Sequence, residues 1–480
     1  CRTSVRKMQA AASHKMNSSR CIGPISRRSF LKVGTLGVGG LSLSDVFRLR
    51  AAAGETNVAP DTSVIFIWLA GGPPHMETYD MKPDAPSDYR GQFLPIRTNV
   101  PGIEVCELLP MHAKCADKYT LIRSVAHKFS DHGGGSKRFL TGRIPKEPTG
   151  TVNDAPAVGS IVAKMREHID IGLPNYITGT NIGRDKIDTY GFGTAYLGPQ
   201  YFPFNIAGDP SEPKFEIKNL ALNHAISDRL DDRLRLLESL DLLRSEIDSS
   251  GVMDSVDKFN QQAISLLTSP QAREAFDLSK EPTRIRERYG KHAWGQRALL
   301  ARRLVEAGCS FVTMVMENPY QSGVKYPKNG FYNWDSHAVN CDLWTDARHR
   351  FPIYDRAVTA LIEDLHARSL TKKVLLVVTG EFGRSPRVSV SKRADGTRYG
   401  REHWPQAMSI LVSGGGMQHG QVVGSTNAKG EHPHTRPLTP NDLWATVYRH
   451  LGIDTEATFL DHSGRPMTIL PFGEPIAELL

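Results

Sequence analysis

The segment VLLVVTGEFGRSPR, Val374 to Arg387, constrains the fold more than any other part of the chain. Its five consecutive apolar residues, Val374 to Val378, are typical of a strand buried on both faces, as in a parallel sheet covered by helices on both sides. The strand ends at Thr379-Gly380, and Glu381 is the first ionisable side chain beyond it. A turn with a surface salt bridge to Arg384 would explain these residues. A metal or anion site would explain them as well.

Similar apolar runs recur along the chain and alternate with amphipathic segments. Such runs are Val64 to Leu69, Cys309 to Met316 and Ala407 to Ser413, and the more mixed segments Lys118 to Ser124 and Pro174 to Thr178 are also predicted strands. Helical patterns span Asp154 to Arg166, Pro352 to Ser369 and Asn441 to Leu451. This alternation predicts an α/β fold with a doubly wound, mainly parallel sheet. Residues 216–307 are Leu- and Arg-rich and predict a helical insertion in that domain.

Ionisable side chains follow the predicted strands at the points where the strands end. The groups, in chain order, are Glu77 with Asp80, His132 with Ser136, Asp335 with His337, Glu381 with Arg384, and His403. The carboxyl ends of strands in a doubly wound sheet meet at one edge, so these groups are expected to converge there.

Two of these groups allow alternative interpretations. Three glycines separate His132 from Ser136, and they form either a flexible loop or an anion-binding concavity to which Lys137 and Arg138 add positive charge. Asp335 and His337 lie two residues apart, so in an extended segment both side chains point the same way. They either share a divalent metal or form an Asp–His hydrogen bond within a loop.

The N-terminal segment has the features of an export signal. Residues 1–53 hold ten Lys or Arg residues and one acid, whereas residues 54–480 carry one more acid than base, which argues against nucleic acid as a partner. Arg27-Arg28 precedes a short, glycine-rich apolar run and Ala51-Ala52-Ala53, a pattern typical of a twin-arginine leader cleaved near Ala53. No apolar run reaches the length of about 20 residues that spans a bilayer. We therefore expect a periplasmic or extracellular protein consisting of residues 54–480.

Several motifs resemble those of a known family. AGGPPHMETYD, FLTG at residues 139–142, NWDSH, TGEFGRSP and GREHWP are similar to the motifs of the DUF1501 family of exported bacterial proteins, and their order resembles that of the alkaline phosphatase and sulfatase superfamily. The resemblance implies an alkaline phosphatase-like fold holding one or two metals, with Zn, Mn or Ca as candidates. The implied metal ligands are Asp335, His337, Glu381, His403 and either Glu77 or Asp80.

The sequence departs from the superfamily pattern near the implied catalytic residues. Glu381 replaces the usual Asp, and Phe382 stands where the superfamily has His. The nucleophile position of the sulfatases falls on His132, with no Cys nearby, so a formylglycine mechanism is disfavoured. Ser136 or a water activated by the metal then becomes the expected nucleophile, and Arg384 would join the anion-binding cations.

The resemblance therefore implies a metal-dependent hydrolase of phosphate or sulfate esters, with an ester or a polysaccharide as substrate. The alternative is a protein that keeps the hydrolase fold without activity and serves in binding or assembly. The aromatic segment from Tyr190 to Phe204, with Trp334 and Trp404, would suit carbohydrate stacking in that case.

Overall fold

The computed structural model describes residues 61–169, 171–180, 191–213, 215, 266, 269–321 and 323–480. The chain divides into two compact units, Cys1–Asn57 and Val58–Leu480, and the described residues belong to the second. The predicted leader, residues 1–53, lies outside the described residues, as does Tyr190 at the start of the predicted aromatic segment.

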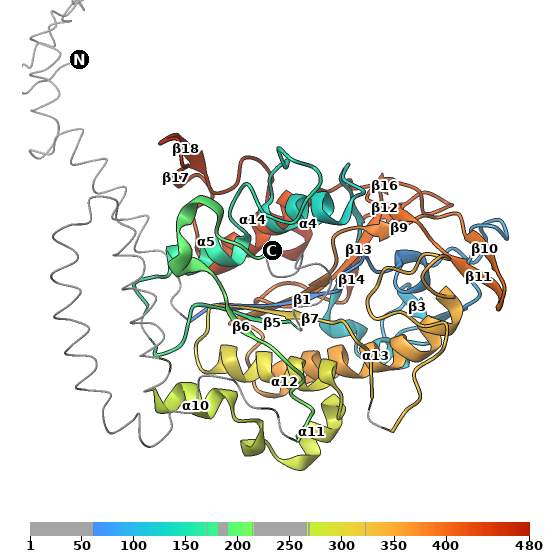
Figure 1. Cartoon of the computed structure of the whole chain (residues 1–480), viewed down its shortest axis with the longest axis horizontal. Helices are drawn as coiled ribbons and strands as arrows, with labels where there is room; N and C mark the ends of the chain where they lie inside the picture. The colour runs from blue at the N-terminus through green and yellow to red at the C-terminus, as the bar shows by residue number, and fades with distance from the viewer. Residues whose placement is uncertain are drawn as a thin grey trace, which may run out of the picture. The chain divides into compact units, whose positions relative to one another are not determined.

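An eight-stranded sheet forms the centre of the second unit (Figure 1). Its order is β14-β4-β13-β8-β1-β7-β5-β6, and every neighbouring pair is parallel except those that β13 makes with β4 and β8. The bounds are β1 Ser63–Trp68, β4 Thr120–Val125, β5 Tyr176–Gly179, β6 Phe204–Ile206, β7 Phe311–Val315, β8 Val374–Thr379, β13 Met408–Gly414 and β14 Gln421–Val423. The predicted mixed α/β class with a mainly parallel sheet is confirmed, and every residue of β1 and β8 is buried.

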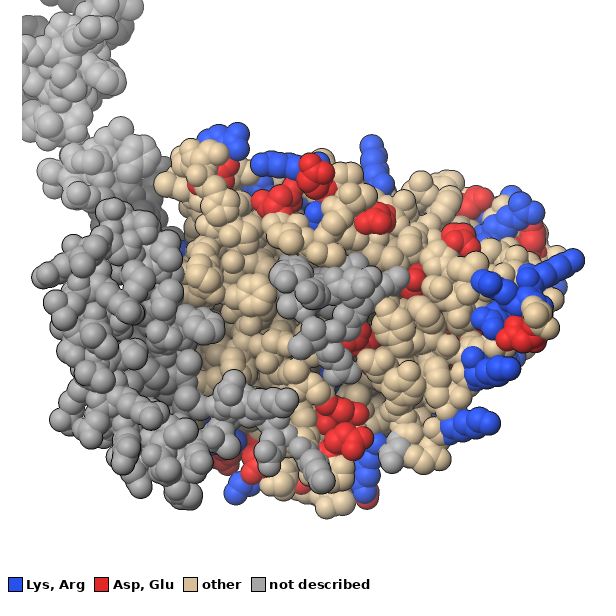
Figure 2. All heavy atoms as spheres, viewed as in Figure 1, with Lys and Arg blue, Asp and Glu red and all other residues tan. Residues whose placement is uncertain are grey.

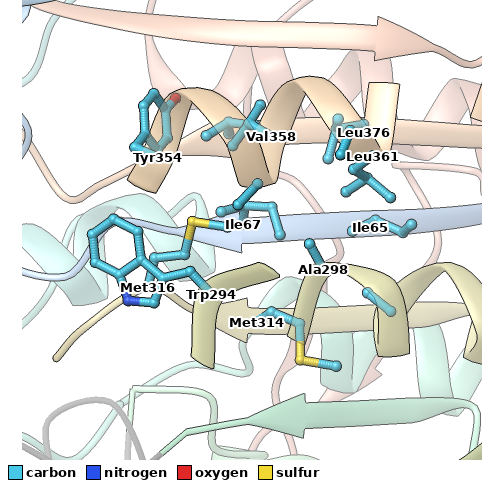
Figure 3. Close-up of a cluster of buried hydrophobic side chains, with 14 of the residues drawn as sticks. Ile65, Ile67, Trp294, Ala298, Met314, Met316, Tyr354, Val358, Leu361 and Leu376 are labelled. Carbon is cyan, nitrogen blue, oxygen red and sulfur yellow. The ribbon is translucent and has the colours of Figure 1, made fainter. Parts of the chain in front are cut away.

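Helices cover both faces of this sheet (Figure 1). The helices α12 (Ala293–Glu306) and α13 (Leu343–Ala367) lie on one face, and α4 (His132–Thr141), α5 (Val158–Met165) and α14 (Pro440–Leu451) lie on the other. Side chains of a strand alternate between faces, so Ile65 and Ile67 join one apolar core while Phe66 and Trp68 join the other. Figure 3 shows the first core, in which Ile65 and Ile67 of β1 pack among residues of α12 and α13, the two helices that cover this face.

The helix α13 begins earlier than its sequence pattern predicts. The helix expected to start at Pro352 begins at Leu343, because the Asp342 carboxylate caps it by accepting a hydrogen bond from the Thr345 amide at 3.0 Å. Pro352 therefore lies inside α13. The predicted insertion, residues 216–307, lies partly outside the described residues, but its last helix, α12, packs directly on β1 and β7. This part of the predicted insertion is a layer of the domain, because twelve of the fourteen residues of α12 are buried.

Short elements complete the described part of the chain. Two of them matter for the site: β9 (Gly383–Arg384) pairs with β12 (His403–Trp404), and β10 (Ser389–Arg393) forms a hairpin with β11 (Gly396–Gly400). The others are β2 Pro95–Arg97, β3 Glu104–Cys106, α3 Pro110–Lys114, α10 Pro270–Phe276, α11 Thr283–Tyr289, β15 Ser425–Thr426, β16 Pro433–Thr435, β17 Thr458–Leu460 and β18 Pro466–Thr468.

Candidate metal centre

Four segments bring ionisable side chains to one edge of the sheet. β4, β8 and β7 run parallel to β1 or to one another across the sheet, so the segments that follow them carry His132, Glu381 and Asp335 to the same edge. β13 runs in the opposite direction, so its amino end lies at this edge and brings His403 with it. The predicted convergence at the strand ends is therefore observed for these four residues.

Asp335 lies at the middle of the cluster. Its Oδ1 atom is 2.6 Å from Nη2 of Arg384 and 3.0, 3.2 and 3.3 Å from the Nε2 atoms of His337, His403 and His132. The Nε2 atoms of His337 and His403 are 2.8 Å apart. Donor atoms of His132, Asp335 and His403 all lie within 4.8 Å of one another, a spacing that could hold a metal ion.

Each of the three imidazoles is held from behind through Nδ1. His132 Nδ1 lies 2.7 Å from Oε1 of Glu381, His337 Nδ1 lies 2.5 Å from Oε2 of Glu402, and His403 Nδ1 lies 2.6 Å from the Ser130 carbonyl oxygen. All three partners only accept hydrogen bonds, so each Nδ1 carries a proton. In a neutral imidazole the Nε2 atom then presents a lone pair, and three such lone pairs face the Asp335 carboxylate.

A cation among these atoms resolves a conflict between acceptors. Without one, the 2.8 Å contact of His337 Nε2 with His403 Nε2 opposes two lone pairs, or two protons if both rings are charged. Burial lowers the pKa of His403, and its contact with Asp335 only partly offsets that effect, so the neutral ring is favoured at neutral pH. A divalent metal also balances the local charge, because with Arg384 it matches the carboxylates of Asp335, Glu381 and Glu402. The donor set therefore fits a metal ion.

Arg384 supports Asp335 and does not face outward. Its side chain is fully buried, and it donates to the carbonyl oxygens of Gly72 at 2.9 Å and Arg401 at 3.1 Å, and to that of Gly71. Burial raises the pKa of Asp335, but the contacts with the three imidazoles and the charge of Arg384 outweigh burial and hold that pKa well below its usual range. The expected role of Arg384 as an anion-binding cation needs correction, since its donors serve the backbone and Asp335.

Glu381 has a different place from the predicted one. Its carboxylate accepts hydrogen bonds from the Gly71 amide at 2.9 Å and from His132 Nδ1, so it orients an imidazole from outside the cluster. His127 holds the backbone here, with Nε2 donating to the Glu381 carbonyl oxygen at 2.6 Å. Phe382, buried, packs against the rings of His132 and His403 with centroids 5.3 and 4.6 Å away.

Glu77 and Asp80 do not reach the cluster, which corrects their prediction as metal ligands. The short 3₁₀ turn His75–Glu77 directs Glu77 to Arg401, whose Nη2 lies 2.6 Å from Oε1, and both side chains are fully buried. Asp80 accepts from Lys82 at 2.9 Å and from the Thr426 hydroxyl. These carboxylates join the first strand to later parts of the chain.

The segment with three glycines forms the start of α4 and not a free loop. The Asp131 carboxylate caps this helix through the amides of Gly133 and Gly134, which places His132 at the first helical position. A Cβ atom on Gly134 would lie 2.2 Å from the Pro148 carbonyl oxygen, so glycine is required by close packing.

Three residues of α4 that were predicted to act in catalysis or anion binding make their contacts outside the cluster around Asp335. Lys137 donates to the carbonyl oxygens of Glu147 at 2.9 Å and Thr149 at 3.0 Å, and Arg138 lies over the Phe472 ring. The anion-binding prediction for both cations therefore needs correction, because the helix directs them away from the cluster. Ser136 lies one helical turn after His132 and is buried, and its hydroxyl is not among the cluster contacts described above.

Sequence reasoning missed two residues of the site. Glu402, whose side chain is 56% exposed, orients His337, and His127 fixes the Glu381 backbone. Glu402 stands beside His403 in the GREHWP motif, so its position was a usable signal. His132 was expected at a nucleophile position, but the structure brings its imidazole into the group of donors that could hold a metal ion.

Comparisons with solved structures find weak similarity over most of the chain. A phosphonate monoester hydrolase from Silicibacter pomeroyi is 11% identical with a TM-score of 0.36, covering 86% of this chain and 76% of the other. The PsFucS1 sulfatase from Pseudoalteromonas sp. is 12% identical with a TM-score of 0.32, covering 85% and 70%. The C-terminal periplasmic domain of EcEptC from Escherichia coli, solved with Zn, is 11% identical with a TM-score of 0.33, covering 88% and 93%.

Two further comparisons complete the findings. No curated protein matches this chain. Among the described residues, none of the helices has the length and apolar character that crossing a membrane requires. The sequence model of the DUF1501 family, described as a protein of unknown function, matches residues 61–480, and the chain therefore belongs to this family.

Proposed function

We propose that this protein is a metal-dependent hydrolase of phosphate or sulfate esters, built on an alkaline phosphatase-like fold. One observation carries the proposal: three imidazole Nε2 atoms and Asp335 Oδ1 converge at the strand-end edge while every Nδ1 atom is already held by another acceptor. Metal-binding histidines characteristically have this second contact, which fixes the tautomer and the ring orientation.

The ligands we propose are His132, His337, His403 and Asp335, with Glu381 and Glu402 orienting two of the imidazoles. Three nitrogen donors and one oxygen donor suit Zn or Mn, whereas Ca prefers a full set of oxygen ligands. When bound, such a metal supplies Lewis acidity toward an ester oxygen and activation of water.

The protein's own residues hold the centre rigid and open on one side. Arg384 fixes Asp335 from the buried side, and Phe382 packs under two imidazoles. The histidine side chains remain partly exposed, at 13% for His132, 15% for His337 and 21% for His403, which leaves a path for a substrate. Because the Ser136 hydroxyl is not among the cluster contacts, we assign the nucleophile to water and not to this serine.

The decisive test combines metal analysis with an ester screen. Purified protein should contain about one Zn or Mn per chain, and Asp335→Ala or His403→Ala should abolish both the metal and the hydrolysis of aryl phosphate or aryl sulfate esters. Ser136→Ala is the matched control and should keep both. Absence of a stoichiometric divalent ion, or metal binding unchanged in both alanine variants, would sink the proposal.

We also propose that residues 1–53 are a twin-arginine leader that takes residues 54–480 out of the cytoplasm. Replacing Arg27-Arg28 with two lysines should retain a fusion of residues 1–53 with a folded reporter in the cytoplasm. Export of this variant at the unchanged rate would contradict the proposal.

A second function has one observation in its favour. Arg384, Lys137 and Arg138 all turn their charges to internal partners, so the cations expected to neutralise a transferred phosphate or sulfate are engaged elsewhere. A binding or assembly protein that retains the metal would show this arrangement. The ester screen separates the two functions, because a binding protein would hold the metal and hydrolyse none of the esters.

A further inference from the structure

We propose that the β10–β11 hairpin, Ser389–Gly400, is a docking arm for an anionic polysaccharide, a sugar chain bearing several sulfate or phosphate esters. This inference rests on the proposed function, since it names the polymer whose ester groups would reach the metal centre. The sequence marks this segment as a basic hairpin, and no role in the metal centre accounts for its exposed side chains.

The hairpin is joined to the metal centre at both of its ends. Before the hairpin the chain carries Arg384, which binds Asp335, and directly after it the chain carries Glu402, which orients His337. A Cβ atom on Gly400 would lie 2.0 Å from the Ala338 amide nitrogen, so the base of the hairpin packs tightly on the loop that carries Asp335.

Hydrogen bonds fix the hairpin on this loop. The Arg401 amide donates to the Ser336 carbonyl oxygen at 3.0 Å, and the Tyr399 amide donates to Asp342 Oδ2 at 3.1 Å. Farther out, Arg393 Nη2 donates to the Val339 carbonyl oxygen at 3.1 Å. The hairpin is thus a positioned extension of the site and not a loose loop.

Positive charge gathers on this hairpin and beside it. The hairpin contains three basic residues, Lys392, Arg393 and Arg398, and one acid, Asp395. The acid pairs with Arg398 at 2.8 Å. Lys328, from the neighbouring loop, lies close enough to Asp395 to lower the pKa of that carboxyl group, after the larger effect of Arg398. Residues 54–480 as a whole carry one more acid than base, so this is a local concentration. Figure 2 shows basic side chains gathered at the end of the molecule where Figure 1 places β10 and β11.

The outward face of the hairpin combines a cation with an aromatic ring. Val390 and Tyr399 are cross-strand partners, as are Lys392 and Thr397, and alternation along the strands places these four side chains on one face. All four are exposed, with Val390 at 57% and Tyr399 at 37%. A tyrosine ring offers a flat apolar surface to a sugar, and a neighbouring ammonium group pairs with an anionic ester oxygen.

A polysaccharide fits these features better than a nucleic acid does. Proteins that bind single strands use successive aromatic side chains within a long basic groove, and duplex binding requires neutralisation of many phosphates. The hairpin offers one exposed ring and a few cations, and residues 54–480 around it are close to neutral overall.

The separation of the hairpin from the metal centre predicts a dependence on polymer length. Arg398 precedes Glu402 by four residues, which in extended chain corresponds to roughly 13 Å. This exceeds the Debye length of about 8 Å at physiological ionic strength, so the hairpin charges hardly influence a small ester at the metal. A polymer can contact both places at once.

The test measures binding of dextran sulfate by isothermal titration calorimetry, with neutral dextran and duplex DNA as comparisons. We expect wild-type protein to bind dextran sulfate and the double variant Lys392→Glu/Tyr399→Ser to bind it at least tenfold more weakly, with metal content and small-ester hydrolysis unchanged. The matched control, Lys280→Glu/Leu460→Ser, changes an exposed lysine and an exposed apolar residue away from the hairpin and should bind as wild type does.

Three outcomes would overturn the inference: equal loss in the control, unchanged binding in the hairpin variant, or tighter binding of duplex DNA that the hairpin variant loses. Each of these outcomes is a binding measurement and does not depend on ester hydrolysis. Failure of the proposed function would instead appear as missing metal or missing ester hydrolysis in wild-type protein, so the two failures are distinguishable.

Discussion

Replacing Glu381 with glutamine tests whether this residue orients the proposed metal ligand His132 or binds the metal itself. Glu381→Gln keeps the shape of the side chain but removes the anionic acceptor that holds His132 Nδ1 at 2.7 Å. If Glu381 orients a ligand, the substitution should weaken Zn affinity by about 10–100-fold, the usual effect of losing an orienting partner. That loss corresponds to about 1.4–2.7 kcal/mol of binding free energy.

Two other variants show how large the loss of Zn affinity should be for a ligand and for a more exposed orienting residue. Asp335→Asn removes the anionic ligand and leaves Arg384 buried beside a neutral group, so its loss of Zn affinity should exceed 100-fold. Glu402→Gln acts on His337 from a side chain that is 56% exposed, where solvent weakens the contact, and should cost less than Glu381→Gln.

Competition with a chelator of known affinity provides the assay, and a thermal melt of the metal-free variants confirms that each one is folded. A loss for Glu381→Gln equal to that for Asp335→Asn would mean that Glu381 is itself a ligand, as the sequence predicted. An affinity unchanged from wild type would mean that the contact with His132 does not contribute to metal binding.

Three further predictions concern stability. Arg401→Met leaves Glu77 as an unpaired buried charge and should lower the free energy of unfolding by about 3–5 kcal/mol in urea denaturation, and adding Glu77→Gln should recover part of it; no recovery would refute the pairing. Burial lowers the pKa of His292 to about 4, so below its unfolded value of about 6.5 the unfolded chain binds more protons and stability falls as pH drops from 6.5 to 4. His292 caps α12 by accepting a hydrogen bond from the Gly295 amide at 3.1 Å, so His292→Asn keeps a cap without titrating and should make that slope less steep, measured as urea midpoints across this range. Gly134→Ala would place a Cβ atom 2.2 Å from the Pro148 carbonyl oxygen and should lower both the melting temperature and the Zn affinity, and an unchanged melting temperature would contradict the packing described here.

The sheet was predictable because its signals are local. Runs such as Val64 to Leu69 and Val374 to Val378 are apolar at every position, and only strands covered on both faces bury such runs fully. The start of α13 was not predictable from Pro352, because the Asp342 cap lies ten residues upstream and the burial of the helix against the sheet offsets the hydrogen bond that proline removes.

Glu77, which follows the first strand, shows why the sequence pattern placed a carboxylate in the metal centre incorrectly. Glu77 follows a buried strand, as Glu381 does, and the pattern alone treats them alike. Its partner Arg401 lies 324 residues away in sequence. The guanidinium of Arg401 binds both oxygens of the Glu77 carboxylate, which is therefore not available to the cluster around Asp335. Pairing over such a separation depends on the complete fold and leaves no local signal.

The role of Glu381 follows from the strand beside it. β8 and β1 are neighbours, so the Gly71 amide, three residues beyond β1, lies against the first carboxylate beyond β8 and donates to it at 2.9 Å. This contact holds the carboxylate outside the cluster, where Oε1 reaches Nδ1 of His132 and not the Nε2 atoms around Asp335. Two neighbouring features of the cluster consequently belong together: one of its imidazoles comes from the first position of α4, and Phe382, the residue after Glu381, packs against that ring and against His403.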